Sequence, residues 1–442
     1  MAQQLAFHCE QAWLGGDAAA REVLVEVDGD RITAVTADVP APPGALRLRG
    51  LTLPGIANAH SHAFHRALRS RAQSSVSFWT WRQQMYEVAA TLDPDSYHRL
   101  ARAVYGEMAL AGITCVGELH YLHHAPGGRP YDDANAMGAA LVAAAEEAGL
   151  RITLLDTCYL RGGIGAEPDE DQRRFSDGDV GTWAERASAA ASLASATARV
   201  GAAIHSVRAV GPDDIAVVAG WATANQVPLH AHVSEQPAEN EACLARYGCT
   251  PTALLAERGA LSERFTAVHA THLAGDDVGL LGGSGSTVCL CPTTERDLGD
   301  GIGPAARLVA AGVTLAVGTD SHAVVDPFEE IRAIELHERL VSHRRGNLSA
   351  AALLRAATVD GHRSLGWSDG GALRPGDLAD LVTVRLDSVR TAGAGVEHAL
   401  DVAVFAAGAC DVDHVIVGGR IIVASGVHRS LDVAGELAEA LR

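Results

Sequence analysis

The feature that most constrains the fold of this chain is a repeated alternation of short apolar segments with longer, helix-forming ones. The apolar segments are rich in Val, Ile, Leu and Thr and have the length of β-strands. Eight of them follow one another, at Leu51–His60, Ile113–Tyr121, Ile152–Cys158, Val200–His205, Val227–Val233, Phe265–Ala270, Ser286–Cys291 and Val313–Thr319.

The segments between these strands carry helical patterns, many of which end at a glycine that can adopt a left-handed cap. The predicted helices are Tyr97–Ala111, Asn135–Ala148, Thr182–Thr197, Asp213–Asn225 and Ala305–Ala311. Eight β-then-α units favour a closed (β/α)8 (TIM) barrel of the α/β class. An open doubly wound sheet is the alternative, but no glycine-rich phosphate loop follows the first strand.

The two ends of the chain have a different pattern. Residues 1–50 and 372–442 contain short alternating strands separated by Gly, Asp and Pro, predicted at Glu22–Val27, Arg31–Val35, Leu381–Arg385, Val402–Ala406, Val412–Val417 and Arg420–Val423. We expect these two segments to form one small β-sandwich domain beside a barrel of residues 51–371. The segment from Ala63 to Asp95 should lie over the mouth of that barrel.

The composition excludes several classes of protein. The 442 residues carry a formal net charge of -19. Because proteins that bind nucleic acids need clustered cations, this charge argues against a nucleic-acid partner. The first residues do not resemble a secretory signal, and no apolar run has the length of a membrane span. We therefore expect a soluble cytoplasmic protein with neither a nucleic-acid nor a membrane partner.

Histidines gather at the ends of the predicted strands. His60 and His62 end the first strand, and the period of two places both side chains on one face. His230 and His232 end the fifth strand, His269 ends the sixth, and Asp320 follows the eighth. Because the strands of a barrel end at one common face, these groups should meet there, whereas core histidines would be scattered.

Three imidazoles and a carboxylate suit Zn²⁺, or Fe²⁺ with less discrimination, and leave a position for water. All 35 basic residues are arginine, so a carbamylated lysine cannot bridge two metals and one metal per chain is expected. Glu235 stands three residues after His232 and is a candidate proton shuttle, although it could instead cap a helix. His269 and Asp320 would stabilise the attacking water.

The chain resembles the amidohydrolase superfamily deaminases over nearly its whole length. The resemblance is carried by LPGIANAHSH, HAHVSEQ, VHATHL, GTDSH and GALRPGDLADLV. It implies metal ligands His60, His62, His232 and Asp320, with Glu235 as the proton shuttle and His269 as the residue that orients water.

Within the superfamily, AFHRAL, FWTWRQQMY, ELHYLHH and AIHSVRAV resemble the formimidoylglutamate deiminases of histidine degradation. That resemblance implies hydrolysis of N-formimidoyl-L-glutamate to N-formyl-L-glutamate and ammonia in a homodimer. Tyr121, His205, Arg208 and Arg82 become candidates for the substrate carboxylates, with Arg82 reaching in from its own subunit or a partner. His65 stands where that family has glutamine, so its contact with substrate is altered.

Arginine suits a dianionic substrate because its planar fork matches a carboxylate. Arg208 could instead form a structural salt bridge at the barrel rim, and Arg82 could stack on its aromatic neighbours. Two other functions stay open. One is a deaminase of a purine, a pyrimidine or another cyclic amidine, and the other is a non-catalytic barrel that serves as an interaction scaffold.

Overall fold

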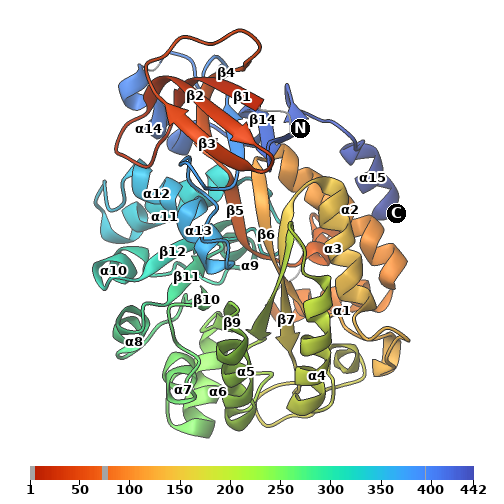
Figure 1. The fold of residues 1–442 in the computed structure, drawn as a ribbon. Coiled ribbons are helices and arrows are strands. Elements are labelled where there is room, and N and C mark those ends of the chain that lie inside the picture. The colour runs from red at the N-terminus through yellow and green to blue at the C-terminus, as the bar shows by residue number, and fades with distance from the viewer. Residues whose placement is uncertain (1–4, 72–77, 394) are drawn as a thin grey trace.

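The computed structural model describes residues 5–71, 78–393 and 395–442. Its centre is a ring of eight parallel strands in chain order, surrounded by helices (Figure 1). The strands are β5 (Ile56–Ser61), β6 (Ile113–His120), β7 (Arg151–Cys158), β8 (Ala198–Ile204), β9 (Leu229–Val233), β10 (Phe265–His269), β11 (Thr287–Leu290) and β12 (Thr314–Val317). The (β/α)8 prediction is confirmed.

The ring is completed between its first and last strands. The main-chain N–H of Asp320 donates to the carbonyl oxygen of His60 at 3.0 Å, and the N–H of His62 donates to that of Asp320 at 3.2 Å. Closure therefore occurs at the positions from which the predicted metal ligands project.

The helices that cover the barrel begin and end at recognisable signals. Asp93 and Ser96 form a reciprocal capping box at the start of α2, and Gly149 ends α3 with φ of 79°. The helices are α1 (Phe78–Ala90), α2 (Pro94–Leu110), α3 (Ala136–Ala148), α4 (Val180–Ala190), α5 (Pro212–Asn225), α6 (Pro237–Tyr247), α7 (Pro251–Glu257), α8 (Asp277–Gly283), α9 (Pro292–Leu298), α10 (Ala305–Ala310), α11 (Pro327–Ser342), α12 (Ala350–Ala357), α13 (Val359–Ser364), α14 (Ala399–Phe405) and α15 (Val433–Ala440).

A second, mixed sheet is built from both ends of the chain and lies at one end of the barrel (Figure 1). Its order is β16-β15-β14-β13-β4-β1-β2-β3. The strands are β1 (Leu5–Ala12), β2 (Ala20–Asp28), β3 (Arg31–Thr36), β4 (Leu46–Pro54), β13 (Leu381–Val384), β14 (Val412–Val417), β15 (Arg420–Ala424) and β16 (Val427–His428). Arg151 of β7 and Asp380 form a buried two-hydrogen-bond ion pair that joins barrel to sheet.

Three predicted elements differ from the structure. The predicted strand Leu51–His60 is divided at Gly55, where a Cβ would lie 2.3 Å from Thr114 Oγ1 and only glycine fits. Before it, β4 joins the mixed sheet, and after it, β5 joins the barrel. The predicted strand Val402–Ala406 is helix α14, because its apolar side chains pack against helices of the barrel instead of another strand. The predicted helix Thr182–Thr197 ends at Ala190, before a short 3-10 turn.

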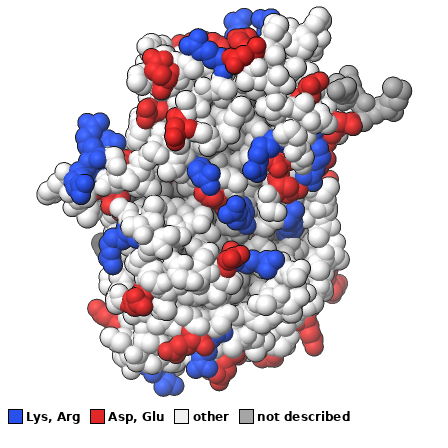
Figure 2. Space-filling model, turned by 60° about the vertical axis from the view of Figure 1, so that its left-hand side comes forward, with Lys and Arg blue, Asp and Glu red and all other residues white. Residues whose placement is uncertain are grey.

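Surface charge is dispersed. On the face drawn in Figure 2, the described arginine side chains lie among acidic ones. This arrangement differs from the continuous basic surface typical of nucleic-acid-binding proteins. Among the described residues, no helix combines the length and the apolar character needed to cross a bilayer.

Candidate metal centre and catalytic cavity

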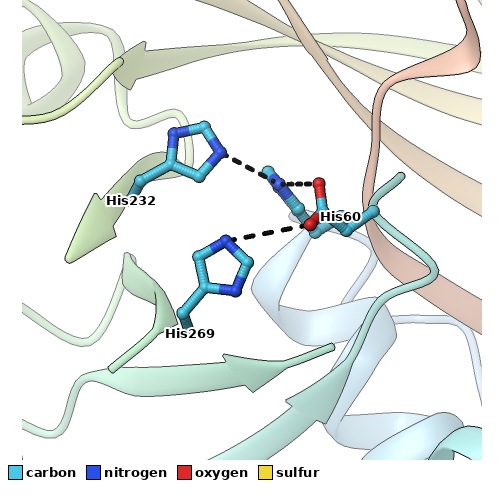
Figure 3. Close-up of side chains that lie close together, drawn as sticks. His60, His232 and His269 are labelled. Atoms are coloured by element: carbon cyan, nitrogen blue, oxygen red, sulfur yellow. Dashed lines mark hydrogen bonds and ion pairs between the residues drawn. The ribbon is translucent and has the colours of Figure 1, made fainter. Parts of the chain in front are cut away.

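The predicted ligands meet at the carboxyl-terminal ends of the barrel strands. His60 projects from β5, His232 from β9 and His269 from β10, whereas His62 directly follows β5 and Asp320 lies three residues beyond β12. All five side chains are buried. Figure 3 shows His232 and His269 pointing toward His60 from neighbouring strands.

Four of these side chains place one atom each at a common point. The Nε2 atom of His232 lies 3.2 Å from that of His60 and 3.3 Å from that of His62, and Oδ1 of Asp320 lies 3.3 and 3.5 Å from the same two nitrogens. In a tetrahedral zinc site with bonds of about 2.0–2.1 Å, neighbouring ligand atoms are about 3.3 Å apart. The four atoms therefore have the separations of a zinc ligand set.

The hydrogen bonds behind the rings fix which nitrogen carries a lone pair. Nδ1 of His62 donates to the carbonyl oxygen of Leu119 at 3.0 Å, and Nδ1 of His232 donates to that of His205 at 2.8 Å. Burial lowers the pKa of both rings, that of His232 to about 3, so both are neutral. Two Nε2 lone pairs then face one another in a buried space, an arrangement that a shared cation stabilises.

The remaining histidines at this face differ in their position. His269 lies farther out, with Nε2 at 3.9 Å from Oδ2 of Asp320. His269 nevertheless converges with His60, His232 and Asp320 within 4.8 Å, and His65 converges with His62 and Asp320 in a second group, so that the two groups share Asp320. His230 is separate, because its Nε2 donates to the carbonyl oxygen of Ser364 at 2.9 Å, so it does not join the cluster.

Glu235 lies beside the donor cluster. Its Oε1 is 3.9 Å from Nε2 of His269, and its Oε2 accepts a hydrogen bond of 3.0 Å from Arg208. Helix α6 begins after Gln236, so Glu235 is not its cap. Although burial disfavours its charge, Arg208 and His269 lower the pKa of Glu235 to about 2, which keeps the carboxylate ionised.

The pKa of His269 shifts in the opposite direction from the pKa values of His62 and His232. Burial disfavours its charge, but Glu235, Glu295 and Asp320 together raise the pKa of His269 to about 10. Glu295 of α9 lies 3.6 Å from its Nδ1. The arrangement provides an anionic base and a buried cation on the same side of the cluster.

A cavity of about 60 Å³ leads to the cluster. All five residues predicted to contact substrate line it, namely His65, Arg82, Tyr121, His205 and Arg208. Its wall also includes Trp81 and Met85 of α1, so the described part of the predicted mouth segment Ala63–Asp95 lines the cavity, whereas residues 72–77 lie outside the described residues. Arg82 both lines the cavity and lies over the ring of Tyr86 at 5.6 Å.

Three functional features were not predicted from the sequence. Arg161 lines the cavity just after β7, at a strand end that could have flagged it. Glu295 contacts His269 from the helix after β11. Glu118 accepts hydrogen bonds of 2.6 Å from Ser61 Oγ and from the N–H of Ala63, on either side of His62, and thereby fixes the chain that carries this ligand.

Glu118 belongs to a buried hydrogen-bond network that the spacing of residues in the sequence does not predict. Burial raises the pKa of Glu118 to about 8. Ser61 Oγ also contacts Nε2 of His322 at 3.2 Å, and Nδ1 of His322 contacts Thr319 Oγ1 at 3.0 Å. The network therefore links the chain around His60 and His62 to the loop that carries Asp320.

Comparison with known proteins agrees with this geometry. Residues 51–422 match the model of the amidohydrolase family. The chain is 37% identical to the formimidoylglutamate deiminase of Pseudomonas aeruginosa, over 92% of each chain, and 30% identical to the 8-oxoguanine deaminase of the same organism, over 94% of this chain and 92% of that one.

Solved structures show the same architecture. An amidohydrolase from Brucella melitensis superposes with a TM-score of 0.92 at 33% identity, over 99% of both chains. An adenosine deaminase from Xanthomonas campestris with bound zinc superposes with a TM-score of 0.84 at 26% identity, over 99% of this chain and 96% of that one. The fold, the donor cluster and these matches together show that the chain belongs to the amidohydrolase family.

Proposed function

We propose that the chain hydrolyses N-formimidoyl-L-glutamate to N-formyl-L-glutamate and ammonia. The observation that carries the proposal is one cavity that combines the donor atoms of His60, His62, His232 and Asp320 with three arginines, Arg82, Arg161 and Arg208. An acyclic substrate with two carboxylates requires such cations. The 37% identical relative named formimidoylglutamate deiminase supports the same substrate.

The metal of the proposal is one Zn²⁺ per chain, held by His60, His62, His232 and Asp320. When bound, it supplies Lewis acidity that brings the pKa of water to about 7. The donor set fits zinc through its separations of 3.2–3.5 Å and its facing lone pairs. Iron satisfies the same donors with less discrimination.

The chain's own groups account for the proton transfers. Glu235 is ionised and takes a proton from the attacking water as the water oxygen bonds to the formimidoyl carbon, and then delivers that proton to the terminal nitrogen. Glu235 next takes the remaining proton of the added hydroxyl group and delivers it to the same nitrogen. The C–N bond then breaks, ammonia leaves, and the water oxygen becomes the formyl oxygen. His269 carries a positive charge beside Asp320 and stabilises the negative charge that develops during attack.

Two of the residues predicted to contact the substrate, His65 and Tyr121, contact each other in the cavity. His65 Nε2 contacts the hydroxyl of Tyr121 at 2.8 Å, and its ring lies edge-on to Trp81. We infer that this pair takes the place of the glutamine expected at residue 65 and presents the Tyr121 hydroxyl to the substrate. The expected cytoplasmic location and homodimer stay predictions of the sequence.

A second candidate is deamination of a cyclic amidine. Aromatic rings of Trp81, Tyr121, Tyr159 and Phe175 line the cavity and could stack on a planar base. The 30% identical 8-oxoguanine deaminase favours the same chemistry. A neutral ring would gain less than a dianion from the three cavity arginines, so this alternative uses them less fully.

Ammonia release across a substrate panel tests the proposal. The panel contains N-formimidoyl-L-glutamate, N-formimidoyl-L-glutamine, guanine, 8-oxoguanine and cytosine, each with zinc-loaded protein. We expect turnover of N-formimidoyl-L-glutamate, with kcat/KM falling when its distal carboxylate is an amide. Turnover of a ring substrate alone would refute the proposal.

A further inference from the structure

Helix α1 forms one wall of the catalytic cavity. Four of its side chains line the cavity, those of Trp81, Arg82, Met85 and Tyr86. The helix lies outside both sheets, so side-chain contacts and not a β-ladder determine where it lies. Because small displacements of a site residue weaken binding and catalysis, the residues that hold α1 in place matter for the reaction.

A short segment after β7 contacts α1 through buried side chains. This segment is the 3-10 helix η3 (Gln172–Phe175), in which Gln172, Arg174 and Phe175 are each at most 2% exposed. The ring centroid of Phe175 lies 5.8 Å from that of Tyr86 on α1. The segment therefore directs most of its side chains toward the interior and toward α1.

Arg174 binds the carboxyl-terminal end of α1. Its guanidinium donates hydrogen bonds to the carbonyl oxygens of Ala89 and Leu92, the latter at 2.8 Å, and its Nε donates to that of His124 at 3.2 Å. Among the described residues, no carboxylate forms an ion pair with Arg174, and burial lowers its pKa. The negative end of the α1 dipole compensates this buried cation instead.

Gln172 binds two tyrosines of the cavity wall. Its Oε1 accepts a hydrogen bond of 3.0 Å from the main-chain N–H of Asp169, which fixes the orientation of the amide. Its Nε2 then donates to the hydroxyl of Tyr86 at 2.9 Å and to that of Tyr159 at 3.0 Å. Because Tyr86 belongs to α1 and Tyr159 directly follows β7, one amide joins the helix to the barrel.

Two histidines of the motif ELHYLHH fix η3 relative to the barrel. The N–H groups of His123 and His124 both donate to the carbonyl oxygen of Arg174, at 3.2 and 2.9 Å. Nε2 of His123 donates to the carbonyl oxygen of Thr157 at 2.9 Å, and Nε2 of His124 contacts Asp177 at 3.0 Å. These contacts attach η3 to β7 and to the loop after β6, so η3 is a fixed support for α1.

We propose that Gln172 and Arg174 are positioning residues that fix α1 as a wall of the catalytic cavity. Neither side chain lines the cavity, so both act through Tyr86 and the end of α1. The inference rests on the proposed function in taking this cavity as the place where substrate binds. Loss of either contact weakens substrate binding and leaves Glu235 and the four donors in place.

Hydrogen exchange of α1 tests the assignment without a substrate. We expect the backbone protection of residues 78–92 to fall by about 10- to 100-fold in zinc-loaded Arg174→Gln, because hydrogen bonds from a buried cation to the end of the helix are lost. Peptides from β9 and β10 should exchange as in wild type. Gln172→Met removes the amide donors at similar volume and is the second variant, with protection of the same residues about 3- to 10-fold lower.

Arg332→Gln is the matched control. Arg332 makes the same kind of contact with another helix, because its guanidinium donates to the carbonyl oxygen of Val404 at 2.9 Å and to that of Ala407, at the end of α14. None of the described residues of α14 lines the cavity. This variant should raise the exchange of residues 399–407 and leave the exchange of α1 and the KM unchanged.

Steady-state kinetics distinguish positioning from a loss of folded protein. Arg174→Gln should raise KM by about 10-fold and keep kcat within about threefold of wild type, because the reacting groups are unchanged. A merely structural role lowers kcat at constant KM, since part of the sample is inactive. Wild-type exchange of α1 in both variants, a uniform rise of exchange along the chain, or a fall in kcat alone would each overturn the inference.

The outcomes separate this inference from the proposed function. If wild type releases no ammonia from N-formimidoyl-L-glutamate, the proposed function falls, and the exchange of α1 in the two variants still decides the inference. If wild type turns over N-formimidoyl-L-glutamate but both variants keep the wild-type KM and the wild-type exchange of α1, only the positioning role is overturned.

Discussion

Replacing Glu235 by glutamine separates proton transfer from metal binding. The amide keeps the volume of the carboxylate, and its oxygen can still accept the hydrogen bond that Arg208 donates at 3.0 Å. The amide has no basic oxygen to accept a proton from the water. It also lacks the negative charge that the carboxylate oxygen places 3.9 Å from Nε2 of His269. General base catalysis contributes about 10²–10⁴-fold, which corresponds to about 2.7–5.4 kcal/mol in the activation free energy. We therefore expect kcat to fall by about 10³-fold.

The metal content of Glu235→Gln should equal that of wild type, because Glu235 is not one of the four converging donors. The assay is ammonia release at saturating substrate, with zinc per chain measured by elemental analysis on the same preparation. Glu241→Gln, an exposed substitution on α6, is the control and should keep wild-type kcat. A Glu235→Gln protein with full zinc and wild-type kcat would refute the role of Glu235 as the base.

Two further predictions concern a buried ion-pair network on the barrel. Arg186 donates two hydrogen bonds to Asp156, at 2.6 and 3.1 Å, and two to Asp177, at 2.8 and 2.9 Å. Arg186→Ala leaves both buried carboxylates without this partner, so it should lower the free energy of unfolding, measured in urea, by about 3–5 kcal/mol. Arg296→Ala breaks an exposed pair and should cost less than about 1 kcal/mol, and equal losses would contradict this reasoning. Burial opposes the charge of Asp177, but hydrogen bonds from His124 and Arg186 lower its pKa. The stabilisation from ionised Asp177 is therefore complete above the unfolded carboxyl pKa of about 4 and is lost as the pH falls below it. Urea titrations of wild type and Asp177→Asn at pH 7 and at pH 3 measure this loss. The difference in unfolding free energy between the two proteins should be smaller at pH 3.

The barrel could be predicted because its signal is local and repeated. Each strand is an apolar run bounded by turn residues, and the eight parallel strands appear within a few residues of their predicted bounds. The ligand positions followed from the same pattern, since His60, His232 and Asp320 stand at strand ends. Strand ends meet at one face in a barrel, so knowing the fold located the cluster.

The errors arose where local pattern and tertiary packing disagree. The run Leu51–His60 is mainly apolar on both sides of Gly55, so its pattern does not mark where the chain passes from one sheet to the other. The β-branched segment Val402–Ala406 looks like a strand but forms a helix against α11 and α12. Helix α4 ends early because Ser192 and Ser195 make local hydrogen bonds with the backbone that compete with the helix.

Parts of the site had no sequence signal at all. The contact of Glu118 with Ser61 and the contact of Glu295 with His269 both join residues that carry no motif in the sequence. Their roles depend on distances between separate elements of the fold, which spacing in the sequence does not encode. The supporting contacts of a catalytic site are consequently harder to predict than its ligands.

Diffraction from crystals of the zinc-loaded protein at the zinc absorption edge tests the central claim most directly. We predict one anomalous peak per chain, within about 2.0–2.2 Å of Nε2 of His60, His62 and His232 and of one oxygen of Asp320. A peak held by other residues, two peaks in one cavity, or four side chains paired with one another around no metal would contradict it.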